Sequence, residues 1–295
     1  MNDGLLQLFT SQGGVATTGQ ILGHLTRHRF DVYVETGVLE RIWQGVYCLG
    51  EPTDLLRLRG LDLSAGRPVA VCLATAAAVY GFDTEQPDDL HVLNPPGCAL
   101  RDADGLVVHR RDGAPLVVVD GRRVTSPAWT AIEVARSLRR GRALATLDAA
   151  LRSGTCTLPD LWRAAIEQKG RRGIVAVRQL LPLADPRAES PMESEARLVM
   201  IDGNLPIPEL QYEIVDGNGD LRRLDFAWPD ARLAVEYDSV DWHSNPEAMA
   251  NDRRRQAALM DVGWTVVPIV FDDVRYRSGE LVARLDGQLY DARAA

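Results

Sequence analysis

Three carboxylates, Asp225, Glu236 and Asp238, lie on two short β-prone runs joined by a Pro-Asp turn within residues 224–238. Apolar residues alternate around Asp225 on the first run, which is typical of a strand. Glu236 and Asp238 are two residues apart on the second run, so they face the same way. Carboxylates that converge repel one another unless a hard divalent cation such as Mg²⁺ or Mn²⁺ binds them. The hairpin therefore predicts a metal site suited to phosphodiester hydrolysis.

A Trp-His pair ending at His243 follows the hairpin, and this histidine can serve as a general acid or base. The next segment is a predicted helix with Arg253, Arg254 and Arg255, which point in three directions around its axis. At least one of them is expected to face the carboxylates, where it can hold a phosphate. The alternative for the acids is a set of solvated charges at strand ends, and for the arginines a solvated helix face.

The stretch that ends at His243 precedes an arginine-rich run and a Gly-Trp pair that opens a last apolar strand. On these residues, region 190–295 resembles the very short patch repair endonucleases and their relatives in the restriction-endonuclease-like, PD-(D/E)XK, superfamily. The resemblance implies that Asp225 is a metal ligand and His243 the acid or base. It also implies a catalytic helical glutamate, for which Glu193 is the first choice and Glu195 a substitute.

The third element of that superfamily is Glu-x-Lys, but this chain has Glu236-Tyr237-Asp238, and residues 190–295 contain no lysine. In the patch-repair-like branch a histidine and bound metals are thought to replace the lysine. The resemblance therefore implies that Glu236 and Asp238 complete the ligand set together with Asp225.

The first 50 residues predict three short helices followed by a hairpin with a tight turn at Gln44-Gly45. This order is typical of a winged helix-turn-helix. It resembles the winged helix that begins the abortive-infection type IV antitoxins, a resemblance that rests on Val15, Thr17, Gln20, Gly37, Leu39, Arg41, Gly45, Val46 and Tyr47. A winged helix usually binds DNA, and we expect the contacts to come from the start of the third helix and from the wing, namely Arg27, His28, Arg29 and Arg41. The alternative is a module for folding or protein contact.

The sequence predicts a mixed α/β (α+β) protein with three parts. These are a winged helix over residues 1–50, a mixed α+β middle over residues 51–185 and a restriction-endonuclease-like α/β domain with a central mixed sheet over residues 190–295. The middle part weakly resembles the body of antitoxin-like proteins. Its two strand-end histidines, His91 and His109, are more readily explained as half-buried positions than as metal ligands.

The chain has no membrane-length apolar run and no basic-then-apolar N-terminus, which favours a cytoplasmic protein without a membrane partner. Its four cysteines lack metal-site spacing, so reduced thiols are expected. The net charge is −8, and from residue 190 onward eleven arginines face twenty acidic residues. Unsteered binding to a duplex should therefore be weak, which favours a protein that acts locally or with a partner.

Two functions follow from these patterns. The first is a metal-dependent DNA endonuclease or nickase with a winged-helix targeting module, acting in defence or repair. Such an enzyme would need a homodimer to cut both strands in one encounter. The alternative is a non-catalytic, DNA-binding, antitoxin-like transcriptional regulator, with a toxin as its protein partner and the nuclease fold as a scaffold.

Overall fold

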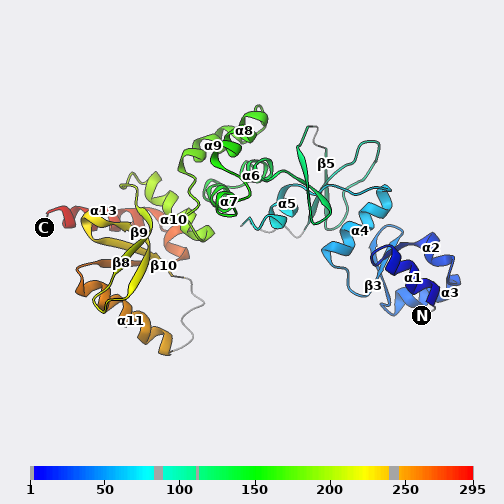
Figure 1. Ribbon diagram of the computed structural model, residues 1–295, viewed down its shortest axis with the longest axis horizontal. Coiled ribbons are helices and arrows are strands. Elements are labelled where there is room, and N and C mark those ends of the chain that lie inside the picture. Colours follow the sequence, from blue (N-terminus) through cyan, green and yellow to red (C-terminus); the bar gives the residue numbers. More distant parts are fainter. Residues whose placement is uncertain (1–2, 83–88, 111–112, 239–245, 295) are drawn as a thin grey trace. The chain divides into compact units, whose positions relative to one another are not determined.

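The computed structural model describes residues 3–82, 89–110, 113–238 and 246–294, in which helices alternate with several small sheets (Figure 1). The predicted mixed α+β class is confirmed. The chain divides into two compact units, the first formed by residues 1–79 and 86–126 and the second by residues 80–85 and 127–295. The domain boundaries expected near residues 50 and 185 stay predictions. Within the described ranges, no helix is long and apolar enough to cross a membrane.

The first unit begins with a winged-helix arrangement around its own apolar core, which includes Leu5, Ile21 and Phe30. Thr17 caps the second helix and forms a capping box with Gln20, a pattern that fixes the start of a helix. The three strands form one sheet in the order β1-β3-β2. The elements are α1 (Asp3–Ser11), β1 (Val15–Thr17), α2 (Thr18–Leu22), α3 (Arg27–Glu35), β2 (Leu39–Trp43) and β3 (Val46–Leu49).

The rest of the first unit holds two helices and two two-stranded pairings. The β4 and β5 strands pair in parallel, whereas β6 and β7 are antiparallel. Asp62 accepts hydrogen bonds from Arg122 and thereby joins a helix to the last strand. The elements are α4 (Asp54–Ala65), α5 (Leu73–Val79), β4 (Leu90–Leu93), β5 (Leu106–His109), β6 (Leu116–Val119) and β7 (Arg122–Thr125).

The second unit begins with helices that pack tightly, in particular α7 against α10. A buried ion pair joins these two helices, with Arg197 Nη2 at 2.8 Å from Asp148 Oδ2. Two arginines of these helices also bind the segment that leads into α10, residues 183–190. Arg152 donates a hydrogen bond to the carbonyl of Ala188, and Arg197 donates one to the carbonyl of Leu183. The elements are α6 (Pro127–Ala135), α7 (Arg140–Arg152), α8 (Leu158–Glu167), α9 (Ile174–Leu180), η1 (Leu181–Leu183) and α10 (Pro191–Asp202).

A four-stranded sheet in the order β11-β10-β9-β8 forms the centre of the remaining part. The β10–β11 pairing is parallel and the others are antiparallel, so this is the mixed sheet that the sequence predicted. One core joins the sheet to α10 and α13, and a second joins it to α11. The elements are β8 (Glu209–Val215), β9 (Leu221–Trp228), η2 (Pro229–Ala231), β10 (Leu233–Tyr237), α11 (Pro246–Asp261), β11 (Thr265–Ile269), α12 (Phe271–Arg275) and α13 (Ser278–Ala294).

Candidate functional site

The backbone pairing of the two central strands, β9 and β10, ends next to the predicted carboxylates. The last paired residues of β9 and β10 are Phe226 and Val235. Asp225 lies immediately beyond this pair, and its Oδ2 accepts the backbone N–H of Tyr237 at 2.9 Å. A side-chain carboxylate thus takes the place of a ladder carbonyl, and the strands leave room for a pocket between them.

The pocket has a volume of about 210 Å³ and is lined by Asp225, Glu236 and Asp238 together with Arg255 and Gln256. The structure therefore brings the three carboxylates expected from the hairpin to one place. Arg255 reaches in from α11, forms an ion pair with Glu236 and also donates to the carbonyl of Arg223 at 3.3 Å. A guanidinium thus provides the cation at this site, in a region without lysine.

Glu193 lies close enough to Asp225 to interact with it electrostatically. Ser190 caps α10 and so places Glu193 in the first helical turn, where its side chain is buried. Its carboxylate accepts the backbone N–H of Glu189 at 2.9 Å and the amide N–H of Gln211 at 3.1 Å. Burial raises the pKa of Glu193, and the nearby Asp225 carboxylate raises it further. Burial also raises the pKa of the half-buried Asp225, so burial opposes ionisation of both carboxyls.

These residues suit a hard divalent cation in their chemistry but not in their arrangement. Carboxylate and amide oxygens are the donors that Mg²⁺ prefers. Within the described ranges, however, no group of three histidine, cysteine or acidic side chains is placed to hold a metal ion. The contact between Glu236 and Arg255 uses one of the three acids. A bound Mg²⁺ or Mn²⁺ therefore stays a prediction that requires the side chains to rearrange.

The other residues expected at this site have different positions. Glu195, the substitute for Glu193, is bound by Arg139 and Arg275 instead. Arg253 and Arg254 are exposed on α11, where Arg254 donates to the side chain of Asn251 at 3.0 Å. His243 lies outside the described residues, as does the segment around it.

Gln211 belongs to this site but carries no signal in the sequence. It lies on β8 with a φ of +52°, in the left-handed region. Its side-chain amide N–H donates a hydrogen bond to the carboxylate of Glu193. Its Oε1 is buried and has no hydrogen-bond partner among the described residues. A glutamine on a partly exposed strand is common, so the sequence does not mark this position. Its contact with Glu193 is visible only in the structure.

The residues predicted to contact DNA lie on two elements of the winged helix, α3 and β2. Thr26 caps α3, and the next three residues, Arg27, His28 and Arg29, are exposed in its first turn. Arg27 forms an exposed ion pair with Asp31 at 3.2 Å, and the Arg29 guanidinium lies over the ring of Tyr33. Arg41 is exposed on β2 of the hairpin that forms the wing.

The middle of the first unit brings His91 and His109 together. Their ring nitrogens Nδ1 and Nε2 are 2.8 Å apart, and the rings stack at a centroid distance of 5.1 Å. Burial lowers the pKa of His91, although Asp89 opposes this shift. The hydrogen bond between the two rings is sufficient to explain why these histidines lie half-buried on their strands.

Comparisons with known proteins concern the middle region and the whole chain. Residues 69–183 match the family model described as the AbiEi antitoxin C-terminal domain. The chain is 57% identical over 271 residues to the uncharacterized protein Rv2248 of Mycobacterium tuberculosis (strain ATCC 25618 / H37Rv), covering 92% of this chain and 100% of the relative. The uncharacterized protein MT2308 of Mycobacterium tuberculosis (strain CDC 1551 / Oshkosh) matches with the same identity and coverage. A crystal structure of the RV2827C protein from Mycobacterium tuberculosis is similar with a TM-score of 0.47 and 18% identity, over 65% of this chain and 78% of that chain.

Proposed function

The chain belongs to the same family as the Mycobacterium tuberculosis proteins Rv2248 and MT2308, and we propose that it is a DNA-binding regulator of the antitoxin kind. The observation that carries this proposal is the order of two modules along the chain. A winged helix occupies the N-terminal 50 residues, and the antitoxin-domain match follows it at residues 69–183. This favours the regulator over the endonuclease.

The winged helix supplies a surface of the right kind for DNA. In a helix-turn-helix the recognition helix enters the major groove with its first turn. In this chain that helix is α3, whose first turn carries Arg27, His28 and Arg29. Arg41 on the hairpin can reach the phosphate backbone beside the groove. The acidic residue Asp31 on the same helix weakens the positive charge, so base contacts or a partner must add to the phosphate contacts. A toxin protein is the partner that this proposal implies.

A fluorescence anisotropy titration tests the proposal with a labelled duplex from upstream of the protein's own gene. We expect tighter binding to this duplex than to unrelated DNA. For Arg29→Ala we expect binding to be weaker by about 5- to 150-fold, which corresponds to about 1–3 kcal/mol for one base contact. The matched control is Arg284→Ala, which removes an arginine from α13 in the second unit. Equal binding of Arg29→Ala and Arg284→Ala would contradict the proposal.

The carboxylate pocket supports a second candidate, a metal-dependent DNA endonuclease. Asp225, Glu236 and Asp238 line one pocket, and the buried carboxyl of Glu193 is nearby. With Arg255 displaced from Glu236, these acids would hold Mg²⁺ or Mn²⁺, which makes a nucleophilic hydroxide available near neutral pH. Raised pKa values at clustered acids are frequent at functional sites.

Plasmid cleavage and metal-dependent stability together test the second candidate. An endonuclease would nick supercoiled DNA with Mg²⁺ or Mn²⁺, and Asp225→Ala would abolish the nicking. Binding of the ion to the native state would also raise the melting temperature of the wild-type protein but not of Asp225→Ala. No nicking and no stabilisation by either ion would leave the regulator as the function of this fold.

A further inference from the structure

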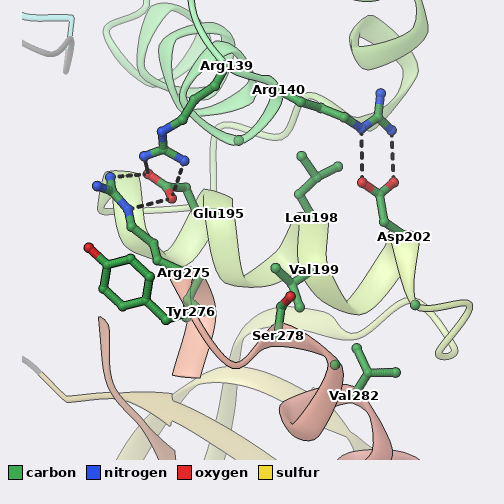
Figure 2. Close-up of a pocket in the computed structure, with 14 residues that line it drawn as sticks. Arg139, Arg140, Glu195, Leu198, Val199, Asp202, Arg275, Tyr276, Ser278 and Val282 are labelled. Atoms are coloured by element: carbon green, nitrogen blue, oxygen red, sulfur yellow. Dashed lines mark hydrogen bonds and ion pairs between the residues drawn. The ribbon is translucent and has the colours of Figure 1, made fainter. Parts of the chain in front are cut away.

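A pocket of about 740 Å³ lies among α7, α10, α12 and α13, and its charged side chains bind one another (Figure 2). Arg139 and Arg275 each donate to the carboxylate of Glu195 at 2.8 Å. Arg140 donates to Asp202 at 2.9 Å. These contacts account for the charges that line the pocket. The strand β6 of the first unit differs, because its polar backbone groups are hydrogen-bonded on one side only.

The strand β6 pairs with β7 in an antiparallel ladder. The N–H of Ser126 donates to the carbonyl of Pro115 at 2.8 Å, so the residue just before the strand faces β7. Because hydrogen-bonded pairs alternate along such a ladder, every second residue faces β7. Leu116 and Val118 are the residues in between, and their N–H and C=O groups point away from it. Among the described residues, these four groups have no hydrogen-bond partner.

The side chains of β6 are apolar and exposed. Leu116, Val117 and Val118 are 40%, 38% and 68% exposed, so both faces of the strand are open to solvent. Single exposed apolar residues are common on protein surfaces. An apolar run on a strand whose outer edge is unpaired is different, because it is a template for pairing with another chain.

Other sheet edges of the described chain are protected against such pairing. The loop before β5 covers the outer edge of that strand, since Asp102 Oδ1 accepts the N–H of Val108 at 2.7 Å. In the second unit the edge strand β11 contains Pro268, and the edge strand β8 has a positive φ at Gln211. Covering loops, prolines and irregular backbone are the usual means of keeping edges apart. Residues Leu116–Val119 are all described, and they contain no such device.

A second copy of β6 fits this edge. Antiparallel pairing about a two-fold axis at Val117 places Leu116 of one copy opposite Val118 of the other. Each such pair exchanges two hydrogen bonds, which satisfies the outward N–H and C=O groups. A ladder centred on Val118 instead would place Leu116 opposite the carboxylate of Asp120. The axis at Val117 therefore gives the register in which apolar side chains meet only one another.

Charge and size also agree with pairing between copies. Each copy has a net charge of −8, but residues 114–119 carry no charge. Beside them the exposed Asp120 is offset by the exposed Arg123, and Arg122 is bound to Asp62. A contact of this length is smaller than the roughly 20–30 residues per side of a stable interface. The pairing should therefore be weak, with monomer and dimer in exchange.

We propose that β6 is the surface through which two copies of this chain associate, as an antiparallel β6–β6 ladder with its two-fold axis at Val117. The contact is isologous, because the same strand is used on both copies. A dimer of this kind presents two winged helices, which suits a DNA site made of two symmetric half-sites. Only this last consequence rests on the proposed DNA binding, since the association itself needs no DNA.

Disulfide trapping in the full-length protein tests the contact and its register. The two Val117 positions form a non-hydrogen-bonded pair with Cα atoms about 4.5 Å apart, which a disulfide can bridge. The two Val118 positions are diagonal neighbours about 7–8 Å apart, which is too far. Under mild oxidation Val117→Cys should form a covalent dimer, and Val118→Cys at least about tenfold less, although Val118 is more exposed. The wild-type protein gives the background from its own four cysteines.

Sedimentation velocity of the wild-type protein, from micromolar to millimolar concentration, measures the association without added cysteines. We expect a reversible shift from monomer to dimer. Val118→Lys should weaken it at least about tenfold, because it places two ammonium groups beside the ladder. The matched control is Val215→Lys, at an exposed apolar position on β8 in the second unit. This variant should associate as the wild-type protein does.

Both lysine variants must first show the wild-type melting temperature, so that a loss of association is not a loss of folding. A wild-type protein that stays monomeric at every concentration would overturn the proposal, and the edge would then await a different protein. Equal association of Val118→Lys and Val215→Lys would overturn it as well. Equal cross-linking of Val117→Cys and Val118→Cys would overturn the register.

Discussion

The same substitution at two positions of α10 should change stability in opposite directions. Glu193→Gln removes a buried carboxyl whose pKa is raised by burial and by the carboxylate of Asp225. Glu195→Gln removes a carboxyl for which burial alone would raise the pKa, but which hydrogen bonds from Arg139 and Arg275 hold below its usual value. The first variant should therefore be more stable than the wild-type protein, and the second less stable.

The contacts of Glu195 set the size of its loss. Removing one partner of a buried ion pair costs about 3–5 kcal/mol. The side chains of Arg139 and Arg275 are 45% and 26% exposed, so solvent screens part of the interaction. We therefore expect Glu195→Gln to lower the free energy of unfolding by about 2–3 kcal/mol.

The contacts of Glu193 predict a gain. A glutamine there keeps an oxygen to accept the N–H groups of Glu189 and Gln211. Its own amide N–H can donate to Gln211 Oε1, which is buried without a hydrogen-bond partner among the described residues. The variant also relieves the repulsion by Asp225, and the sum should be a gain of about 1–2 kcal/mol.

Thermal and urea unfolding followed by circular dichroism measure both changes. In a unit of this size 1 kcal/mol moves the melting temperature by about 2–4 °C, so the two variants should differ by roughly 6 °C or more. Because the folded pKa of Glu193 is raised, wild-type stability should rise as the pH falls through it, and Glu193→Gln should lack this rise. The stabilisation by Glu195 is present above its unfolded pKa and is lost as the pH falls through the depressed folded value. A loss of stability in both variants would refute the reasoning about Glu193.

Three further predictions concern other packed groups. Asp148→Asn should cost about 3 kcal/mol in urea unfolding, and adding Arg197→Met should recover part of it, since the uncompensated buried charge is then gone; an additive double variant would contradict the pairing. Gly173→Ala should lower the free energy of unfolding by at least about 2 kcal/mol, because its Cβ would lie 2.2 Å from a carbonyl oxygen. Gly170→Ala has nearly the same positive φ but open space around the Cβ, and it should cost about 1 kcal/mol. Equal melting temperatures of the two variants would count against this packing. The lowered pKa of His91 means that stability is full above the unfolded pKa of about 6.5 and falls below it; His91→Phe should flatten the melting temperature between pH 5 and 7, and an unchanged profile would contradict burial of the neutral ring.

Local signals were sufficient to predict the winged helix and the hairpin of the C-terminal part. Thr17 and Thr26 cap successive helices, and Gly45 takes a positive φ of 74° in the turn of the wing. Such capping and turn signals act within a few residues, so a single sequence displays them. Alternation around Asp225 likewise predicted the strand that presents it.

Contacts between distant segments could not be predicted in this way. Arg255 was one of three consecutive arginines, and only the packing of α11 on the sheet decides that it meets Glu236. Glu195 differs from its neighbour Glu193 because guanidinium groups from the N-cap of α7 and from α12 bind it, and these lie 56 and 80 residues away in the chain. No periodicity within α10 carries that information.

The salt dependence of DNA binding tests the central claim most directly. For the wild-type protein, the affinity for the upstream duplex is measured by anisotropy at several salt concentrations and compared with that of Arg27→Ala/Arg29→Ala. If Arg29 contacts a base and Arg27 a phosphate, the affinity should fall at every salt concentration, and the slope of log affinity against log salt should become less negative by about 0.9. Unchanged affinity and slope would contradict the assignment of DNA binding to α3.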